Sequence, residues 1–208
     1  MMQTSEAEAN EDDNEATITV GDGNTLSRKF HLPLPGGYSF VLSTSAGDPS
    51  DKYHQGKNFY SLDFQQSGSD YPSRPIPVYS MTAGKIVQIS SSEADKNNGY
   101  FVRIDQDGDG DRNTGLVTVY LHFASSPARA NGTLLKKGDT VEVGDQLGYM
   151  GNTGISFGTH LHITMICDGG ATSSTQKECL DSVTIDGESI QSFIVGSKYR
   201  SSMTESGR

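Results

Sequence analysis

The stretch LVTVYLHF at residues 116–123 sets the pattern of this chain of 208 residues. It is short, apolar and rich in β-branched and aromatic side chains, which favour strands. Similar runs recur between turn-forming Gly, Asn, Asp and Pro residues, among them YFVRID at 100–105 and HLHITMI at 160–166. Amphipathic helical periodicity is scarce. The pattern therefore predicts an all-β protein with few or no helices.

Composition predicts one ordinary domain with polar ends. The chain has 33% hydrophobic residues, 24 Gly and 7 Pro, and it is long enough to bury a sizeable core. Six acids and no base fall within the first 15 residues, so we expect an acidic disordered tail over 1–17. A single domain would occupy 18–200, followed by a flexible tail over 201–208, and we expect a monomer.

The net charge of −10 excludes electrostatic attraction to nucleic acid or to anionic membranes as a basis for function. We therefore expect no nucleic-acid partner. No run of 18 apolar residues occurs, so the sequence predicts no transmembrane helix.

Four of the five histidines fall in three short segments. Alternate residues of a strand point to the same face, so His160 and His162 would both face one cleft. His54, Asp63 and one member of that pair could supply the three protein ligands of a catalytic zinc site. The other member could then move protons, a role that His122 could share.

The order of segments from about Lys52 to Met165 resembles the lysostaphin-type zinc endopeptidases, which include the β-lytic metallopeptidases. The segments that carry the resemblance are His54 through Phe64, PVYSMTAGKIVQI, GYFVRID, VTVYLHF, LLKKGDTVEVGDQLGYMGNTG and GTHLHI. The resemblance implies an antiparallel two-sheet fold of the LytM-like type with a central cleft.

The resemblance also implies a role for each of five residues. His54, Asp63 and His162 would bind one zinc ion per chain. His160 would act as the general base, and His122 would be a second catalytic histidine near the developing oxyanion or the attacking water.

The spacing of the first two expected ligands departs from the commonest form of the family. That form has four residues between the metal-binding His and Asp, whereas Asp63 lies nine positions after His54. Longer spacings occur in secreted branches of the family. His31, in FHLPLPGG, is the alternative ligand if His54 does not reach the metal.

The implied activity is hydrolysis of peptide bonds by zinc-activated water. The expected substrates are peptidoglycan peptides, especially glycine-containing cross-bridges, or a glycine-rich matrix protein such as elastin. The expected location is extracellular or periplasmic. The alternative is a catalytically inactive domain of the same fold that regulates cell-wall hydrolases or serves as a binding scaffold. The chain has no H-E-x-x-H and no G-x-S-x-G motif, which excludes two other classes of hydrolase.

The two cysteines, Cys167 and Cys179, flank a polar stretch and lie 12 positions apart. In an exported chain they would form one disulfide, which would stabilise the fold by about 3 kcal/mol in the chain-entropy model. In a cytosolic chain they would be two buried thiols. Neither belongs to a C-x-x-C motif, so a redox or metal role is not expected.

The segment DQDGDGDRNTG at 105–115 resembles the first half of a calcium loop. Asp105, Asp107 and Asp109 alternate, and Gly110 follows them. The twelfth position holds Leu116 instead of a bidentate Glu, which argues against a complete EF-hand. Two interpretations stand, a calcium-stabilised hairpin insertion and a solvated acidic turn between strands.

Three glycines precede the strand that carries the paired histidines. We expect Gly151, Gly154 and Gly158 to let the backbone pass close to the metal and to a substrate chain, because glycine has no Cβ. A cleft lined in this way would suit a compact substrate.

Overall fold

The computed structural model describes residues 17–19, 25–27, 29–90, 92–170, 177, 179–181 and 183–206. The expected acidic tail lies outside this range except for its last residue. Ser201 Oγ donates to the carbonyls of Leu32 and Leu34, and Met203 is buried. The packed body therefore extends beyond residue 200, where the sequence predicted the start of a flexible tail.

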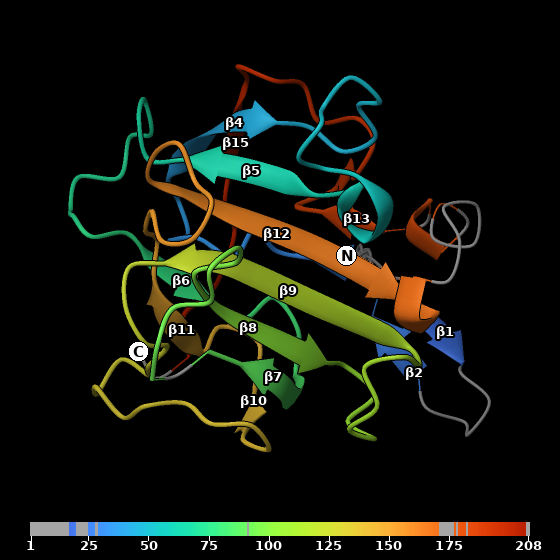
Figure 1. Cartoon of the computed structure of the whole chain (residues 1–208). Helices are drawn as coiled ribbons and strands as arrows, with labels where there is room; N and C mark the ends of the chain where they lie inside the picture. Colours follow the sequence, from blue (N-terminus) through green and yellow to red (C-terminus); the bar gives the residue numbers. More distant parts are fainter. Residues whose placement is uncertain are drawn as a thin grey trace, which may run out of the picture.

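The largest element is an eight-stranded sheet in the order β10-β7-β8-β9-β12-β5-β4-β15 (Figure 1). Every neighbouring pair in it is antiparallel. Its strands are β4 (Ser39–Thr44), β5 (Leu62–Gln65), β7 (Gly84–Ile89), β8 (Tyr100–Asp105), β9 (Leu116–Phe123), β10 (Thr140–Val141), β12 (His160–Cys167) and β15 (Lys198–Arg200).

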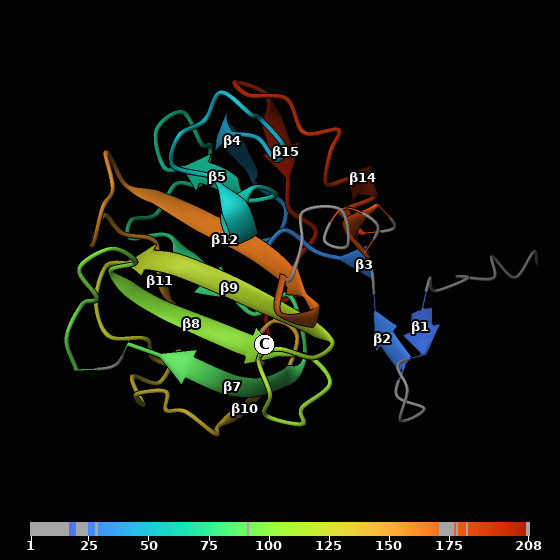
Figure 2. The same cartoon turned by 45° about the vertical axis from the view of Figure 1, so that its right-hand side comes forward.

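Smaller sheets complete the fold. They are β1 (Thr17–Thr19) with β2 (Thr25–Ser27), β6 (Pro77–Tyr79) with β11 (Gln146–Tyr149), and β3 (Lys29–Phe30) with β13 (Thr184–Ile185) and β14 (Glu188–Ser189). The β3–β13 pair is parallel. Figure 2 shows the β1–β2 pair apart from the large sheet. The 3-10 helices η1 (Gly56–Asn58) and η2 (Asp168–Gly170) are single turns, and no described helix has the length and apolar character needed to cross a membrane.

Strand alternation divides the large sheet into a core face and a cleft face. On β12, Leu161, Ile163 and Met165 are buried in the main core, while the residues between them point to the other face. Side chains of β6 and β11, such as Val78 and Leu147, belong to the same core cluster. The expected all-β, antiparallel fold with few helices is confirmed. Of the two sheets that share the main core, one has eight strands and the other, β6 with β11, has two.

The predicted disulfide is present between Cys167, the last residue of β12, and Cys179. The polar segment between them lies largely outside the described residues. The bond ties the end of the strand that carries the paired histidines to the following segment.

Candidate metal centre

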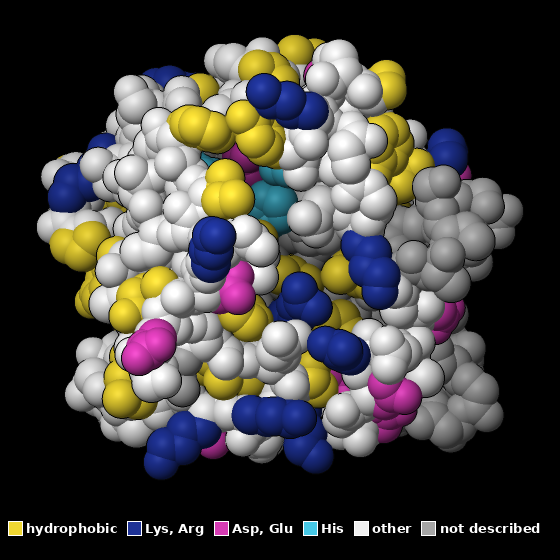
Figure 3. Space-filling model, in the orientation of Figure 1, with side chains coloured by type: hydrophobic (Ala, Val, Ile, Leu, Met, Phe, Trp, Pro, Cys, Tyr) yellow, Lys and Arg dark blue, Asp and Glu magenta, His cyan; other side chains and the backbone are white. Residues whose placement is uncertain are grey.

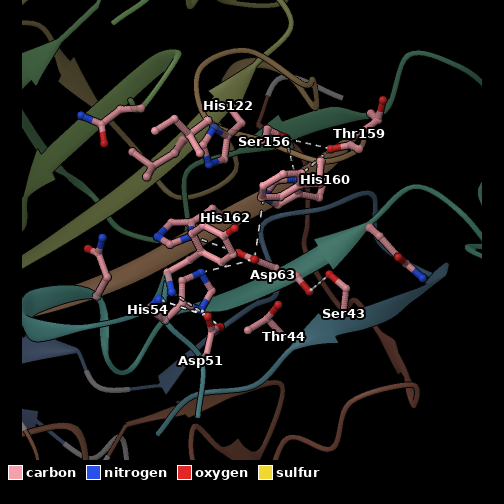
Figure 4. Close-up of a pocket in the computed structure, with 18 of the residues that line it drawn as sticks. Ser43, Thr44, Asp51, His54, Asp63, His122, Ser156, Thr159, His160 and His162 are labelled. Carbon is pink, nitrogen blue, oxygen red and sulfur yellow. Dashed lines mark hydrogen bonds and ion pairs between the residues drawn. The ribbon is translucent and has the colours of Figure 1, made fainter. Parts of the chain in front are cut away.

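Three side chains converge on one point of the cleft face (Figure 4). Asp63 on β5 is the register partner of His162 on β12, so the two side chains lie side by side. His162 Nδ1 is 3.0 Å from Asp63 Oδ1, and His54 Nε2 is 3.3 Å from Asp63 Oδ2. One potential ligand atom from each residue lies within 4.8 Å of the other two.

The long spacing between His54 and Asp63 does not separate them in space. The intervening chain folds into consecutive tight turns over residues 55–61, which include η1. Gly56 has a φ of 60°, a left-handed conformation that favours glycine. These turns take up the additional residues and place His54 beside the start of β5.

His31, the alternative ligand, lies apart from this cluster and does not line the cleft. Its Nδ1 is 2.7 Å from Ser202 Oγ and 3.2 Å from Asp186 Oδ1. These contacts attach the segment before β4 to the β13–β14 turn and to the segment after β15. The structure therefore brings His54, and not His31, to Asp63 and His162.

The donor set fits a metal ion. Asp63 Oδ1 is buried and receives no well-aligned hydrogen bond from the described residues, so a cation there would compensate its charge. Burial by itself would raise the pKa of Asp63, but the rings of His162 and His54 outweigh it and hold that pKa well below its usual range. Burial lowers the pKa of His162, which favours the neutral ring that a metal requires.

Further contacts orient the two imidazoles. His162 Nε2 lies 2.8 Å from Thr164 Oγ1, and the buried Ser61 hydroxyl is hydrogen-bonded to the Thr164 hydroxyl. Asp51 Oδ2 lies 3.3 Å from His54 Nδ1. The Thr164 hydroxyl thus holds the His162 ring and the Asp51 carboxylate lies beside His54, while His162 Nδ1 and His54 Nε2 are directed at Asp63, as in metal sites whose ligands are held by a second layer of polar groups.

A bulge in β9 aims His122 at the cleft. The register with β8 passes from Tyr120 to Phe123, so β9 has one more residue than its partner at this point. Tyr120 and Phe123 both enter the main core, while Leu121 and His122 both line the cleft. His122 has a φ of 65°, a left-handed conformation that is costly for a non-glycine residue. Simple alternation along the strand would not place these side chains in this way.

The ring of His122 has a defined tautomer. Its Nδ1 lies 2.7 Å from the carbonyl of Thr153, which can only accept, so Nδ1 carries the proton. Burial lowers the pKa of His122 to about 4, so the ring is neutral near pH 7. Its Nε2 therefore has a free lone pair and acts as a hydrogen-bond acceptor.

His160 has the same arrangement of its ring nitrogens. Its Nδ1 lies 2.8 Å from the Gly158 carbonyl and 3.2 Å from Ser156 Oγ, while its Nε2 lies 3.8 Å from Asp63 Oδ2. The rings of His160 and His122 are 4.8 Å apart between centroids. Two acceptor nitrogens are thus placed beside the three potential ligands.

The expectation about the glycines before β12 was wrong for two of the three. A Cβ on Gly151 would lie 2.3 Å from Ala124 N, and a Cβ on Gly154 would lie 2.3 Å from Gly99 N. These residues are glycine because the loop packs against the backbone at the end of β9 and in the turn before β8, which also brings the Thr153 carbonyl to His122. A Cβ on Gly158 would meet nothing within 4 Å.

The cluster lies in an open cleft of about 640 Å³, which confirms the expected central cleft. Figure 3 shows a histidine side chain at the bottom of a hollow with apolar side chains around it. Tyr53, Ile155 and Phe157 line the cleft and are themselves exposed, Phe157 to 81%. The rings of Tyr53 and Phe157 are 5.4 Å apart, so segments distant in sequence meet at the rim.

Sequence reasoning missed the residues that orient the ligands. Thr164 follows His162 by two positions on the same strand face, so the alternation that paired the histidines could have identified it. Asp51 and Ser61 have no such signal, because the turns of the preceding loop bring them to the cluster.

Solved structures of several peptidases are similar to this chain. A peptidase described as M23 from Pseudomonas aeruginosa is 25% identical, with a TM-score of 0.42 over 66% of this chain and 46% of that one. Lysostaphin from Staphylococcus simulans is 22% identical, with a TM-score of 0.44 over 66% and 45%. A zinc-containing peptidase from Vibrio cholerae is 24% identical, with a TM-score of 0.48 over 74% and 43%. This chain thus spans less than half the length of each of the three.

A family model described as peptidase family M23 matches residues 64–174. The matched range contains His122, His160 and His162. It begins one residue after Asp63, so the assignment of His54 and Asp63 depends on the geometry described above. Because the match covers more than half of the 208 residues, the chain belongs to peptidase family M23.

Proposed function

We propose that this protein is a zinc-dependent endopeptidase that cleaves glycine-containing peptidoglycan cross-bridges or glycine-rich proteins. The observation that supports this most is the convergence of His54, Asp63 and His162 in a cleft where His160 and His122 present acceptor nitrogens. Two imidazoles with one carboxylate form a ligand set that catalytic zinc sites use, with a further position left for water.

Bound zinc would supply Lewis-acid polarisation of the scissile carbonyl and a water of lowered pKa. His54 Nε2, His162 Nδ1 and the Asp63 carboxylate would hold the ion. His160 Nε2 would accept the water proton as general base and return it to the leaving amine. The hydrogen bond from Nδ1 to the Gly158 carbonyl would stabilise the ring when it is protonated.

His122 would first act as an acceptor, because its only N–H is donated to the Thr153 carbonyl. In this state it can orient a water but cannot donate to an oxyanion. It gains a cleft-facing donor only after it takes up a proton at Nε2. Two adjacent imidazoles do not readily both become charged, so we propose that His122 and His160 share one proton during turnover.

The lining of the cleft supports a neutral, compact peptide as substrate. Among the described lining residues none is Lys, Arg or Glu, and the acids are limited to Asp51 and Asp63. Asn58, Asn97 and Asn98 offer amide groups that can both donate to and accept from a peptide backbone. Glycine residues expose their backbone and carry no side chain that would have to fit beside the exposed rim.

We also propose that the protein acts outside the cytoplasm, in an extracellular or periplasmic space. The Cys167–Cys179 disulfide supports this, because such bonds persist in oxidising compartments. All five functional side chains come from one chain, so we propose that the monomer is sufficient for activity.

The test separates ligands from proton carriers. We expect about one zinc per chain by elemental analysis of the purified protein. His162→Ala should lose both zinc and hydrolysis, whereas His160→Ala should keep zinc and lose about 10²- to 10⁴-fold in kcat on glycine-rich peptides. His31→Ala is the matched control and should retain zinc and activity. Stoichiometric zinc in His162→Ala, or wild-type turnover by His160→Ala, would refute the assignment.

The substrate is tested by turnover of intact peptidoglycan beside elastin. Release of soluble peptides from one of them identifies the natural class. If the zinc-loaded protein cleaves neither substrate nor a pentaglycine peptide, the proposal fails and an inactive binding scaffold of the same fold is favoured.

A further inference from the structure

The loop between β8 and β9 contains a second cluster of converging side chains. Asp105, Asp107 and Asp109 each direct a carboxylate oxygen to within 4.8 Å of the other two. Asp105 is the last residue of β8 and is completely buried, while Asp109 is exposed. Like charges repel, so three converging carboxylates raise the free energy of the loop unless donors or a cation compensate them; Asp107 and Asp109 accept hydrogen bonds from within the loop, which leaves Asp105 as the member to account for.

The buried member of this cluster has an unsatisfied oxygen. Asp105 Oδ2 accepts the Gly110 N–H at 2.8 Å, but Oδ1 is buried and has no hydrogen-bond partner among the described residues. Burial and the neighbouring Asp107 carboxyl raise the pKa of Asp105 to about 7. Lys85 lies near the loop and contributes weakly to lowering the pKa of Asp109, yet no described ion pair joins it to the cluster. A buried carboxylate without a partner is costly unless it binds a proton or a cation.

Glycines shape the loop around this point. A Cβ on Gly115 would lie 2.4 Å from Asp107 Oδ2, so the absence of a side chain there leaves room for the Asp107 carboxylate inside the loop. Gly110 has a φ of 89°, which permits the sharp turn that directs its N–H at Asp105. These two glycines therefore leave room for the Asp107 carboxylate and present an N–H to Asp105.

We propose that this loop binds one calcium ion through the carboxylates of Asp105, Asp107 and Asp109. Calcium is a hard cation that takes oxygen ligands, and the EF-hand loop uses positions 1, 3 and 5 with a glycine at position 6, as here. Leu116 occupies the position of the bidentate Glu, so the site has fewer protein ligands. We therefore expect a weak Kd of about 10⁻⁴ to 10⁻³ M, the range of extracellular calcium modules.

The site would stabilise the β8–β9 hairpin without taking part in peptide hydrolysis. The loop lies where β9 begins, while His122 lies near the end of the same strand. The inference does not depend on the proposed function, because calcium binding at the loop is measured separately from zinc content and turnover.

The test is a titration of the zinc-loaded protein with calcium chloride. Isothermal calorimetry measures the heat of binding, and thermal unfolding measures the change in Tm. We expect one calcium per chain and a rise in Tm of about 3 to 6 °C at a calcium concentration ten times the Kd. Sodium chloride at equal ionic strength should produce no such rise. Absence of both heat and Tm change would overturn the proposal and favour a solvated acidic turn.

Matched variants locate the site. Asp107→Asn and Asp109→Asn should each weaken calcium binding at least ten-fold. Asp111→Asn removes the same charge from the same loop, but outside the cluster, and should bind calcium nearly as wild type does. Asp105→Asn should abolish the calcium response while raising the calcium-free Tm, because it removes the buried charge. If Asp107→Asn and Asp111→Asn lose calcium affinity equally, calcium acts by nonspecific charge screening, and the proposal is also overturned.

Discussion

The two clusters lie toward opposite ends of β9 and differ in their donors. The cleft cluster joins Asp63 to two imidazoles, whereas the loop cluster consists of carboxylates alone. Both contain a buried aspartate, yet the pKa of Asp63 is lowered and the pKa of Asp105 is raised. Burial acts in the same direction on both residues, so the neighbours decide the outcome.

This difference has a consequence for metal choice. Neutral imidazole is a borderline ligand that suits zinc, while a set of carboxylates suits a hard cation such as calcium. The same strand would thus connect the two proposed sites, one for hydrolysis and one for stability.

The largest expected effect is a separation of the two metals. After removal of all metal with EDTA, zinc alone should restore peptide hydrolysis, whereas calcium alone should raise Tm and leave hydrolysis at background. His162→Ala should regain no hydrolysis with zinc but keep the calcium-induced rise in Tm. Hydrolysis supported by calcium alone would show that the two clusters are not distinct in function.

The next effect concerns the hydroxyl that orients His162. Thr164→Val removes the partner of His162 Nε2, so zinc affinity should fall about 10- to 100-fold, with kcat unchanged at saturating zinc. Thr164→Ser should restore the affinity. Thr118→Val is the control. Thr118 lies in β9, and its buried hydroxyl is hydrogen-bonded to that of Thr82 instead of to a histidine. Zinc affinity that stays at the wild-type level in Thr164→Val would remove Thr164 from the site.

The smallest effect concerns a third aspartate, Asp145, whose carboxylate already accepts hydrogen bonds from other groups of the protein. Arg129 Nη1 lies 3.0 Å from Asp145 Oδ2, the Glu142 N–H donates to the same oxygen, and Ser206 Oγ donates to Oδ1. Burial would raise the pKa of Asp145, but these donors outweigh it and lower that pKa. The native state therefore favours the ionised form, and its stabilisation is lost as pH falls through the folded pKa.

Asp145→Asn should accordingly cost about 1 kcal/mol of unfolding free energy at pH 7, and this difference should shrink as the pH falls below about 4. Urea unfolding at pH 7 and pH 3 measures it. Asp139→Asn, at an exposed turn of the same region, should change stability little at either pH. If Asp145→Asn lowers the unfolding free energy equally at both pH values, the stabilisation does not depend on the ionisation of Asp145 and the prediction is wrong.

The strand pattern predicted part of the site correctly. Because side chains alternate along a strand, HLHITMI predicted that His160 and His162 share a face, and the structure places both in the cleft. The same rule could not predict the direction of His122, because the bulge in β9 breaks the alternation. The role expected for Gly151 and Gly154 was wrong because sequence does not reveal which backbone a loop packs against.

The sequence by itself determined the all-β class and the types of donor, since these follow from local periodicity and from side-chain chemistry, and its two cysteines allowed a single pairing without deciding whether the bond forms. Only the tertiary structure decided that His54 reaches Asp63, that the Thr153 carbonyl fixes the proton of His122, and that Asp105 is buried with an unsatisfied oxygen. These features depend on turns and on packing between segments distant in sequence. Distance and burial arise from the folded chain as a whole, so no local pattern encodes them.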